Sequence, residues 1–137
     1  MRPSSGFRIT QDTLKGVLAI YASAWASEAV RYRELQTHAQ DIERAFAFGM
    51  SNGFEDSADQ LIKLLDEPTL STMFNLLQKL EDCRAQADHY YDGLENDPSL
   101  SAYTSGIAEA YKTCGEYLTD VLIEMMIAAP LRTDYLS

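Results

Sequence analysis

The sequence predicts an all-α fold, a small antiparallel helical bundle of three long helices plus one short helix. Two observations support this prediction. Apolar residues recur at helical spacing along three long stretches, and most glycines and prolines fall between those stretches, where helices end. No segment shows the alternating pattern that is typical of strands. A chain of 137 residues has the size of one domain. We expect a single domain over residues 1–137, with 1–9 and 131–137 as flexible or docking ends.

The first helix is predicted to run from Thr10 or Asp12 to Phe48. Gly49 would end it in the left-handed conformation that glycine adopts easily. Such a helix would be about 50 Å long and would extend beyond its partners. Because an uncovered apolar end favours assembly, we expect a homodimer or a complex with another protein. Nine of ten positions spaced alternately by four and three residues are apolar or aromatic, as in a coiled-coil seam: Leu14, Leu18, Tyr21, Trp25, Glu28, Tyr32, Leu35, Ala39, Ile42 and Phe46.

A short helix and a third long helix are predicted next. Ser57 and Gln60 have the spacing of a capping box, which predicts a short helix that ends near Leu65. Pro68 suits the first turn of a new helix, and Gly93 is a plausible terminator for it.

The fourth helix is predicted to begin at Asp97 and Pro98. An aspartate can cap the free backbone N–H groups of a helix start, and proline suits the first helical position. The apolar pattern continues to Pro130. Gly106 and Gly115 leave open whether this helix is continuous.

The charge of the chain is distributed unevenly. The formal net charge is −10, and residues 1–44 carry six bases and five acids, whereas residues 45–137 carry five bases and 16 acids. Binding to phosphates needs clustered Lys and Arg, so we expect no direct nucleic-acid binding and no membrane binding. No signal peptide or membrane-spanning stretch is evident. We therefore expect a cytoplasmic protein with reduced cysteines.

No pattern predicts a catalytic, cofactor-binding or metal site. His38 follows Glu34 by four residues, which does not match the Glu-x-x-His motif of bundles that bind two metal ions. Cys83 and Cys114 both lie on apolar stripes, where cysteine usually acts as a small core residue. We therefore expect no cofactor, no metal and no enzymatic activity.

Two groups of residues are candidates for binding. Tyrosine is enriched at protein interfaces, and Glu28 either fixes the register of an assembly or lies at the edge of the seam. The candidate partner or dimer interface consists of Tyr21, Trp25, Glu28, Tyr32, Leu35, Tyr90 and Tyr91. The candidate acidic face consists of Asp82, Asp88, Asp92, Glu95, Asp97, Glu116, Asp120 and Glu124.

These features favour a non-enzymatic protein-binding module: a small acidic regulator, inhibitor, immunity protein or adaptor. One alternative is a nucleic-acid mimic whose carboxylates occupy the basic groove of another protein. A second alternative is a helical bundle that binds a metal or another ligand. The sequence does not identify the partner.

Overall fold

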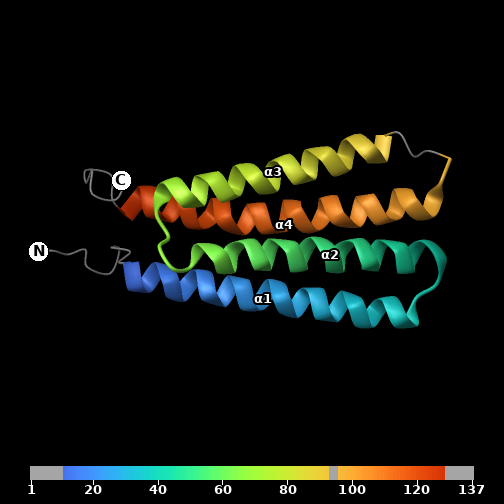
Figure 1. Ribbon diagram of the computed structural model, residues 1–137, viewed down its shortest axis with the longest axis horizontal. Coiled ribbons are helices and arrows are strands. Elements are labelled where there is room, and N and C mark those ends of the chain that lie inside the picture. The colour runs from blue at the N-terminus through green and yellow to red at the C-terminus, as the bar shows by residue number, and fades with distance from the viewer. Residues whose placement is uncertain (1–10, 93–95, 129–137) are drawn as a thin grey trace, which may run out of the picture.

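The computed structural model describes residues 11–92 and 96–128, which form four long helices (Figure 1). They are α1 (Gln11–His38), α2 (Asp41–Leu64), α3 (Leu70–Asp92) and α4 (Pro98–Ala128). The predicted all-α bundle is therefore confirmed. The predicted ends 1–9 and 131–137 lie outside the described residues. Among the residues described, no helix has the length and apolar character needed to cross a membrane.

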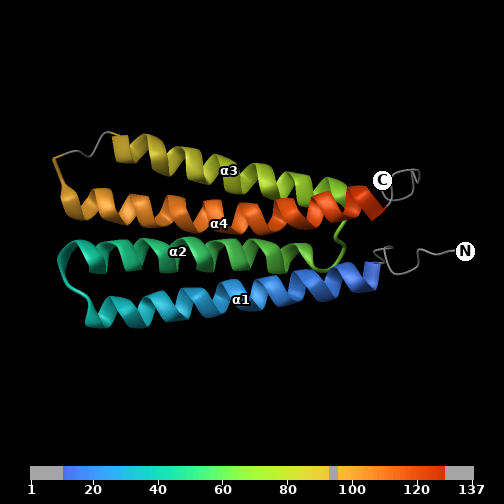
Figure 2. The same cartoon turned by 180° about the vertical axis from the view of Figure 1, so that it is seen from behind.

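The helices lie side by side in the order α1, α2, α4, α3, which is seen from both sides (Figures 1 and 2). Consecutive helices run antiparallel, as predicted. The two central helices, α2 and α4, run in the same direction, and they make the most extensive contact in the bundle. α1 packs on the outer side of α2, and α3 packs on the outer side of α4.

The predicted first helix is wrong at its C-terminal end. α1 ends at His38, and α2 begins at Asp41 after a two-residue connection. Asp41 has a φ of 53°, in the left-handed region that aspartate tolerates better than most residues. The chain therefore reverses without glycine or proline, the two residues that most often mark such a break. With 28 residues, α1 is about 42 Å long and is shorter than the 31-residue α4, so the predicted overhang is absent.

The predicted short helix is also wrong. Its residues form the second half of α2, a helix of 24 residues. Gly49 does not end a helix, because it lies buried inside α2. Ser57 is not a cap, since its hydroxyl donates to the Gly53 carbonyl oxygen at 2.8 Å within the same helix.

The starts of the last two helices agree well with the sequence. Asp97 accepts a hydrogen bond from the Leu100 N–H at 3.1 Å, and α4 begins at Pro98 as predicted. α4 continues without a break through Gly106 and Gly115. α3 begins at Leu70, two residues after Pro68. Gly93 and Pro130, which were predicted to end α3 and α4, lie outside the described residues.

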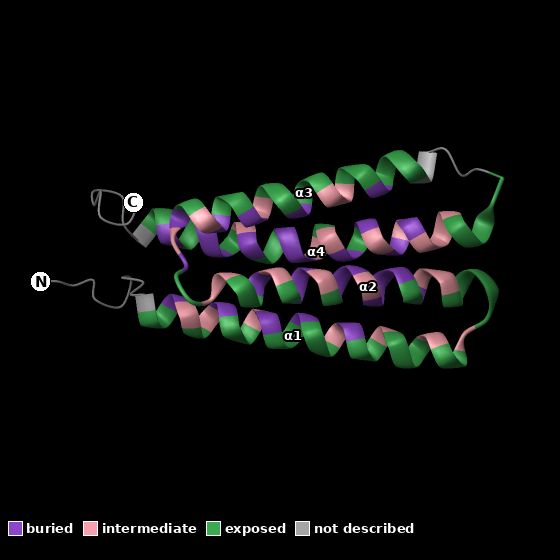
Figure 3. Cartoon of the chain, viewed as in Figure 1, coloured by how far each residue is buried: buried purple, intermediate pink, exposed green. Residues whose placement is uncertain are grey.

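The core differs between the two halves of the bundle (Figure 3). One half consists of residues 11–25, 54–64, 70–80 and 111–128; we call it the leucine-rich half. The other half consists of residues 26–38, 41–53, 81–92 and 98–110; we call it the small-residue half. Large side chains fill the first core: Leu14, Leu18, Trp25, Phe54, Leu61, Leu70, Met73, Leu76, Leu80, Leu118, Val121, Leu122 and Met125. Apart from Met50, the buried residues of the second core are small: Ala29, Ala47, Gly49, Ser51, Gly53, Ala87, Thr104, Gly106, Ala108 and Ala110.

Candidate functional site

Glycines bring α2 and α4 into backbone contact in the small-residue half. A Cβ atom on Gly49 would overlap the carbonyl oxygen of Tyr103, and a Cβ atom on Gly106 would overlap the carbonyl oxygen of Phe46. One turn further along, a Cβ atom on Gly53 would lie 2.6 Å from the Cβ atom of Ala110. Only glycine leaves room for so close an approach, so these residues determine how α2 and α4 pack.

An apolar groove lies beside this contact, with α2 as its floor. Ile42 and Phe46 of α2 form the floor, Tyr32 and Leu35 of α1 form one wall, and Ala102 of α4 belongs to the other wall. The groove has a volume of about 710 Å³, which is in the range of binding pockets in proteins. Leu35 is 44% exposed and Ile42 is 51% exposed. Large apolar side chains are therefore accessible in a concave surface.

α1 and α4 meet across α2 in the leucine-rich half. There, the rings of Tyr21 and Tyr117 lie 5.3 Å apart and close the space above α2. Burial, together with Glu124 and Asp120 of α4, raises the pKa of Tyr21, which agrees with this proximity. In the groove, the facing residues of α1 and α4 do not include a comparable aromatic pair among those described.

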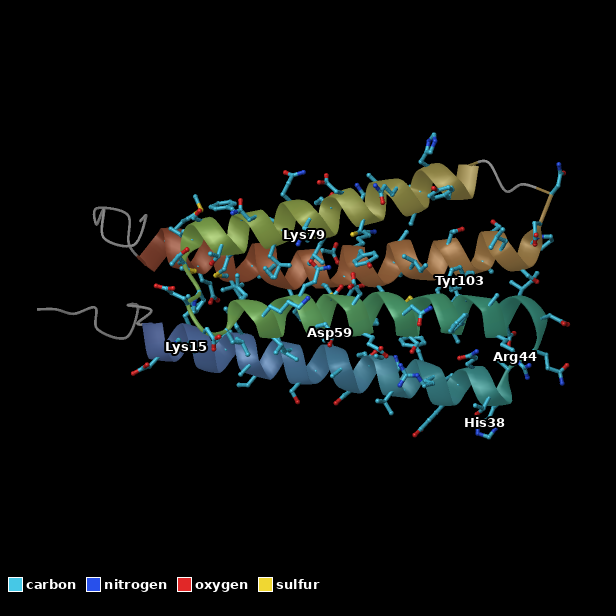
Figure 4. All side chains as sticks on the ribbon, in the orientation of Figure 1. Lys15, His38, Arg44, Asp59, Lys79 and Tyr103 are labelled. Carbon is cyan, nitrogen blue, oxygen red and sulfur yellow. The ribbon has the colours of Figure 1, made fainter. Side chains whose placement is uncertain are left out.

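Polar residues also line the groove. His38, Glu43, Ser101 and Ser105 contribute to its lining. His38 and Arg44 lie near the α1–α2 connection, at the same end of the bundle as Tyr103 (Figure 4). The Arg44 Nε donates to the Ala39 carbonyl oxygen at 3.1 Å, which holds the connection in place. The lining of the groove is thus mainly apolar, with polar groups from α1, α2 and α4.

The structure separates the residues of the predicted interface. Trp25 is 1% exposed and belongs to the core of its own chain. Tyr21 is partly buried and stacks on Trp25 with a ring separation of 6.4 Å. Tyr32 and Leu35 line the apolar groove. The seam predicted for assembly therefore packs largely inside the bundle, and its C-terminal part reaches the groove.

The remaining interface candidates lie at the surface or outside the description. Glu28 lies at the edge of the seam and binds Arg31, with a distance of 2.7 Å between Oε2 and Nη2. This hydrogen bond lowers the pKa of Glu28. Tyr90 is 64% exposed near the end of α3 and does not line the groove. The side chain of Tyr91 lies outside the described residues.

The predicted acidic face is divided between two helices. Asp82 and Asp88 lie on α3, where Arg84 Nη1 binds the Asp88 Oδ2 at 2.5 Å. Asp97 caps α4. The side chain of Asp92, and Glu95 as a whole, lie outside the described residues. The other acidic candidates are exposed on α4: Glu116, Asp120 and Glu124.

A second, more polar groove lies between α2 and α3. Asp56 of α2 accepts two hydrogen bonds on Oδ2, one from the Tyr111 hydroxyl of α4 at 2.6 Å and one from Gln60 Nε2 at 2.9 Å. Burial and this bond to Asp56 raise the pKa of Tyr111. Burial also raises the pKa of the nearby Cys83 thiol, although Tyr111 partly opposes this effect.

Neither groove could be assembled from the sequence. The apolar groove combines residues that are far apart in the sequence, such as Tyr32 and Ser105, and the polar groove combines residues of α2 and α3. One signal for the apolar groove was present, because Leu35, Ile42 and Phe46 belonged to the predicted seam. Asp56 and Tyr111 had no comparable local signal.

The cysteines are free, and the described residues contain no group of three or more His, Cys, Asp or Glu side chains that could hold a metal ion. Burial raises the pKa of Cys114 to about 12, so this thiol stays protonated at neutral pH. Neither thiol has the lowered pKa that favours nucleophilic chemistry.

Comparison with known proteins does not assign this chain to a family. No protein-family model, no curated protein and no solved structure matches it. The function must therefore be inferred from the geometry of the grooves.

Proposed function

We propose that this protein is a non-enzymatic protein-binding module, and that its apolar groove holds an amphipathic helix of a partner protein. The observation that carries the proposal is the set of accessible apolar side chains in one concave site, formed by Tyr32, Leu35, Ile42, Phe46 and Ala102. A small acidic regulator, inhibitor, immunity protein or adaptor would use such a site.

The dimensions of the groove favour a helix as its occupant. Its walls extend over residues 32–38 of α1 and 98–105 of α4, which corresponds to about 10 Å or two helical turns. Recognition of a helix in a groove typically uses apolar residues at positions i, i+3 or i+4, and i+7, which cover two turns. A partner helix would thus occupy the space above α2 that α1 and α4 close in the leucine-rich half.

The charge distribution supports an apolar mode of binding. The groove is built largely from residues 32–47, in and next to the nearly neutral segment 1–44. Arg31 and Glu28 near the groove already neutralise each other. We therefore expect binding to depend weakly on salt concentration, since exposed charges contribute little to it.

A matched pair of isoleucines tests this proposal. Ile42 lies in the groove, whereas Ile62 lies at the other end of the same helix, and their side chains are 51% and 52% exposed. The wild-type protein, Ile42→Glu and Ile62→Glu are used to capture proteins from the native cell. A peptide covering the candidate helix of any captured protein is then titrated against all three by calorimetry.

Loss of peptide binding on Ile42→Glu, with binding retained on Ile62→Glu, would support the groove. Equal binding to the two variants would refute it. The nucleic-acid-mimic alternative predicts a different result, namely a partner that is displaced by DNA or RNA and released steeply by salt.

Homodimerisation remains a prediction, but its original reason no longer applies. It rested on an overhang of the first helix, and α1 is shorter than α4. A measurement of mass by light scattering at micromolar concentration decides it, and a mass of twice 15.3 kDa is the result that a dimer requires.

A further inference from the structure

The polar groove between α2 and α3 is a cavity of about 640 Å³ that the proposed protein-binding site does not use. It exists because α3 packs against α4 and makes little contact with α2. Its lining combines an acid, two amides and two lysines with the apolar side chains of Leu64 and Leu76. Such a mixture of charges of both signs in one cavity is suited to a small ligand that also carries both.

The carboxylate of Asp56 is held in position by two other helical residues. Both the Tyr111 hydroxyl and Gln60 Nε2 donate to its Oδ2 atom, at 2.6 and 2.9 Å. No group within the described ranges donates to its Oδ1 atom. Asp56 therefore presents one fixed and available acceptor at the side of the groove.

Gln60 also carries an acceptor. Its Oε1 atom is buried and has no hydrogen-bond partner among the described residues. Exchanging the positions of the amide oxygen and nitrogen would not give Oε1 a donor, because Oε1 would then face the carboxylate of Asp56. A buried acceptor without a donor is unfavourable, but this atom is closed to solvent, so a ligand in the groove reaches Asp56 and not Gln60 Oε1.

The two lysines supply the opposite charge. Lys63 lies one turn beyond Gln60 on α2, and Lys79 lies on α3 (Figure 4). Neither forms an ion pair with an acid in the part of the chain that the structure describes. This is notable because residues 45–137 contain five bases and 16 acids, so acidic partners are abundant there.

We propose that this groove binds a small zwitterion, an α-amino acid with an apolar side chain. The ammonium group of the ligand donates to Asp56 Oδ1, and its carboxylate binds the ammonium group of Lys63 or Lys79. The side chain packs on Leu64 and Leu76. A simple anion is disfavoured by Asp56, and a simple cation is disfavoured by the lysines, so the pair of charges determines selectivity.

The test uses NMR titration of the full-length protein with L-leucine, L-valine and L-methionine as separate probes. We expect saturable shifts of the Gln60 side-chain amide resonances with at least one of them. For leucine, isoamylamine lacks the carboxylate and 4-methylpentanoate lacks the ammonium group. Each analogue is expected to bind at least about tenfold more weakly, a loss of about 1.4 kcal/mol.

A pair of double variants separates the groove from general effects of charge. Lys63→Gln with Lys79→Gln removes both basic groups of the groove. Both lysines are exposed. Lys15→Gln with Lys112→Gln removes the same charge elsewhere. We expect the first variant to bind at least about tenfold more weakly and the second to bind like the wild type.

Three outcomes would overturn the proposal: no saturable shift with any of the three amino acids, an analogue that binds as tightly as leucine, or an equal loss in the two double variants. None of these outcomes bears on the apolar groove, which is tested by Ile42→Glu and lies in the other half of the bundle.

Discussion

The two halves of this bundle are held together by different kinds of contact. In the leucine-rich half, large side chains from all four helices share one core, and Tyr21 meets Tyr117 across α2. In the small-residue half, Gly49 and Gly106 let the backbones of α2 and α4 touch. Ser51 ties α1 to α2 there through a buried hydrogen bond to the Ala29 carbonyl oxygen, at 2.8 Å.

This difference shows how a small protein can be stable and still keep an apolar surface accessible. Where backbones touch directly, the helices need few large side chains between them. Leu35 and Ile42 are then free to line a groove. Where large side chains fill the core, the same space above α2 is closed.

Truncation of a leucine should have very different effects in the two halves. Leu18 is fully buried in the leucine-rich half, so Leu18→Ala should lower the free energy of unfolding by about 3 kcal/mol. Leu35 is 44% exposed, so Leu35→Ala should cost less than about 1 kcal/mol. Urea denaturation followed by circular dichroism measures both. Similar losses for the two variants would contradict the contrast.

Replacing glycine by alanine should have opposite effects on the free energy of unfolding at Gly49 and at Gly16. Gly49→Ala places a methyl group where the Tyr103 carbonyl oxygen lies, and such overpacking should cost about 2 kcal/mol. Gly16 has no atom within 4 Å of the position of an added Cβ, so Gly16→Ala should raise the free energy of unfolding by about 0.5–1 kcal/mol. Thermal denaturation of the two variants shows the direction directly. A stabilising Gly49→Ala would mean that the backbones do not touch.

Tyr111 lies in the leucine-rich half next to its boundary with the small-residue half, and its removal should have a moderate effect. Tyr111→Phe deletes the hydrogen bond to Asp56 and should cost about 1 kcal/mol at pH 7. Because the pKa of Tyr111 is raised in the folded state, the wild type loses stability as the pH rises above the ordinary tyrosine value of about 10. The Phe variant lacks this ionisation. The difference in free energy of unfolding between the wild type and Tyr111→Phe should therefore become smaller above that pH. A difference that does not change with pH would contradict the proposed role of the Tyr111 hydroxyl.

The Glu28–Arg31 pair near the groove should have the smallest effect. Both side chains are substantially exposed, so Glu28→Gln should change the free energy of unfolding by less than about 0.5 kcal/mol at pH 7. The pKa of Glu28 is lowered in the folded state. Its contribution is therefore present above the ordinary glutamate value of about 4.3 and disappears as the pH falls below it. Glu34→Gln serves as the control. If the free energy of unfolding changes equally with falling pH in both variants, the effect is one of net charge alone.

Local features of the sequence predicted several helix starts but missed the chain reversal between α1 and α2. The Asp97 cap and the start at Pro98 depend on neighbouring residues, so they could be recognised without a structure. The reversal depends on Asp41 in the left-handed region. That conformation is uncommon for aspartate, and the apolar spacing continued across it from Leu35 to Ile42 and Phe46. A seam pattern alone could not show that these residues belong to two helices.

The glycines illustrate the same limit. Gly49 and Gly106 were interpreted as a helix end and a possible break, because glycine often has that role. In the structure both lie inside helices, and each leaves room for the backbone of the other helix. The distinction depends on a neighbour that is 54 to 60 residues away in the chain, Tyr103 for Gly49 and Phe46 for Gly106, which no local pattern reveals.

By itself, the sequence determined the all-helical class, the acidic character of residues 45–137 and the caps that begin α4, since composition and local hydrogen bonds decide these features. The tertiary structure alone decided that α2 and α4 run parallel in contact, that the first seam divides between two helices, and that two grooves flank α2. The physical reason is that grooves arise from the way helices pack. That packing depends on which side chains from distant parts of the chain meet, and on how closely their backbones can approach.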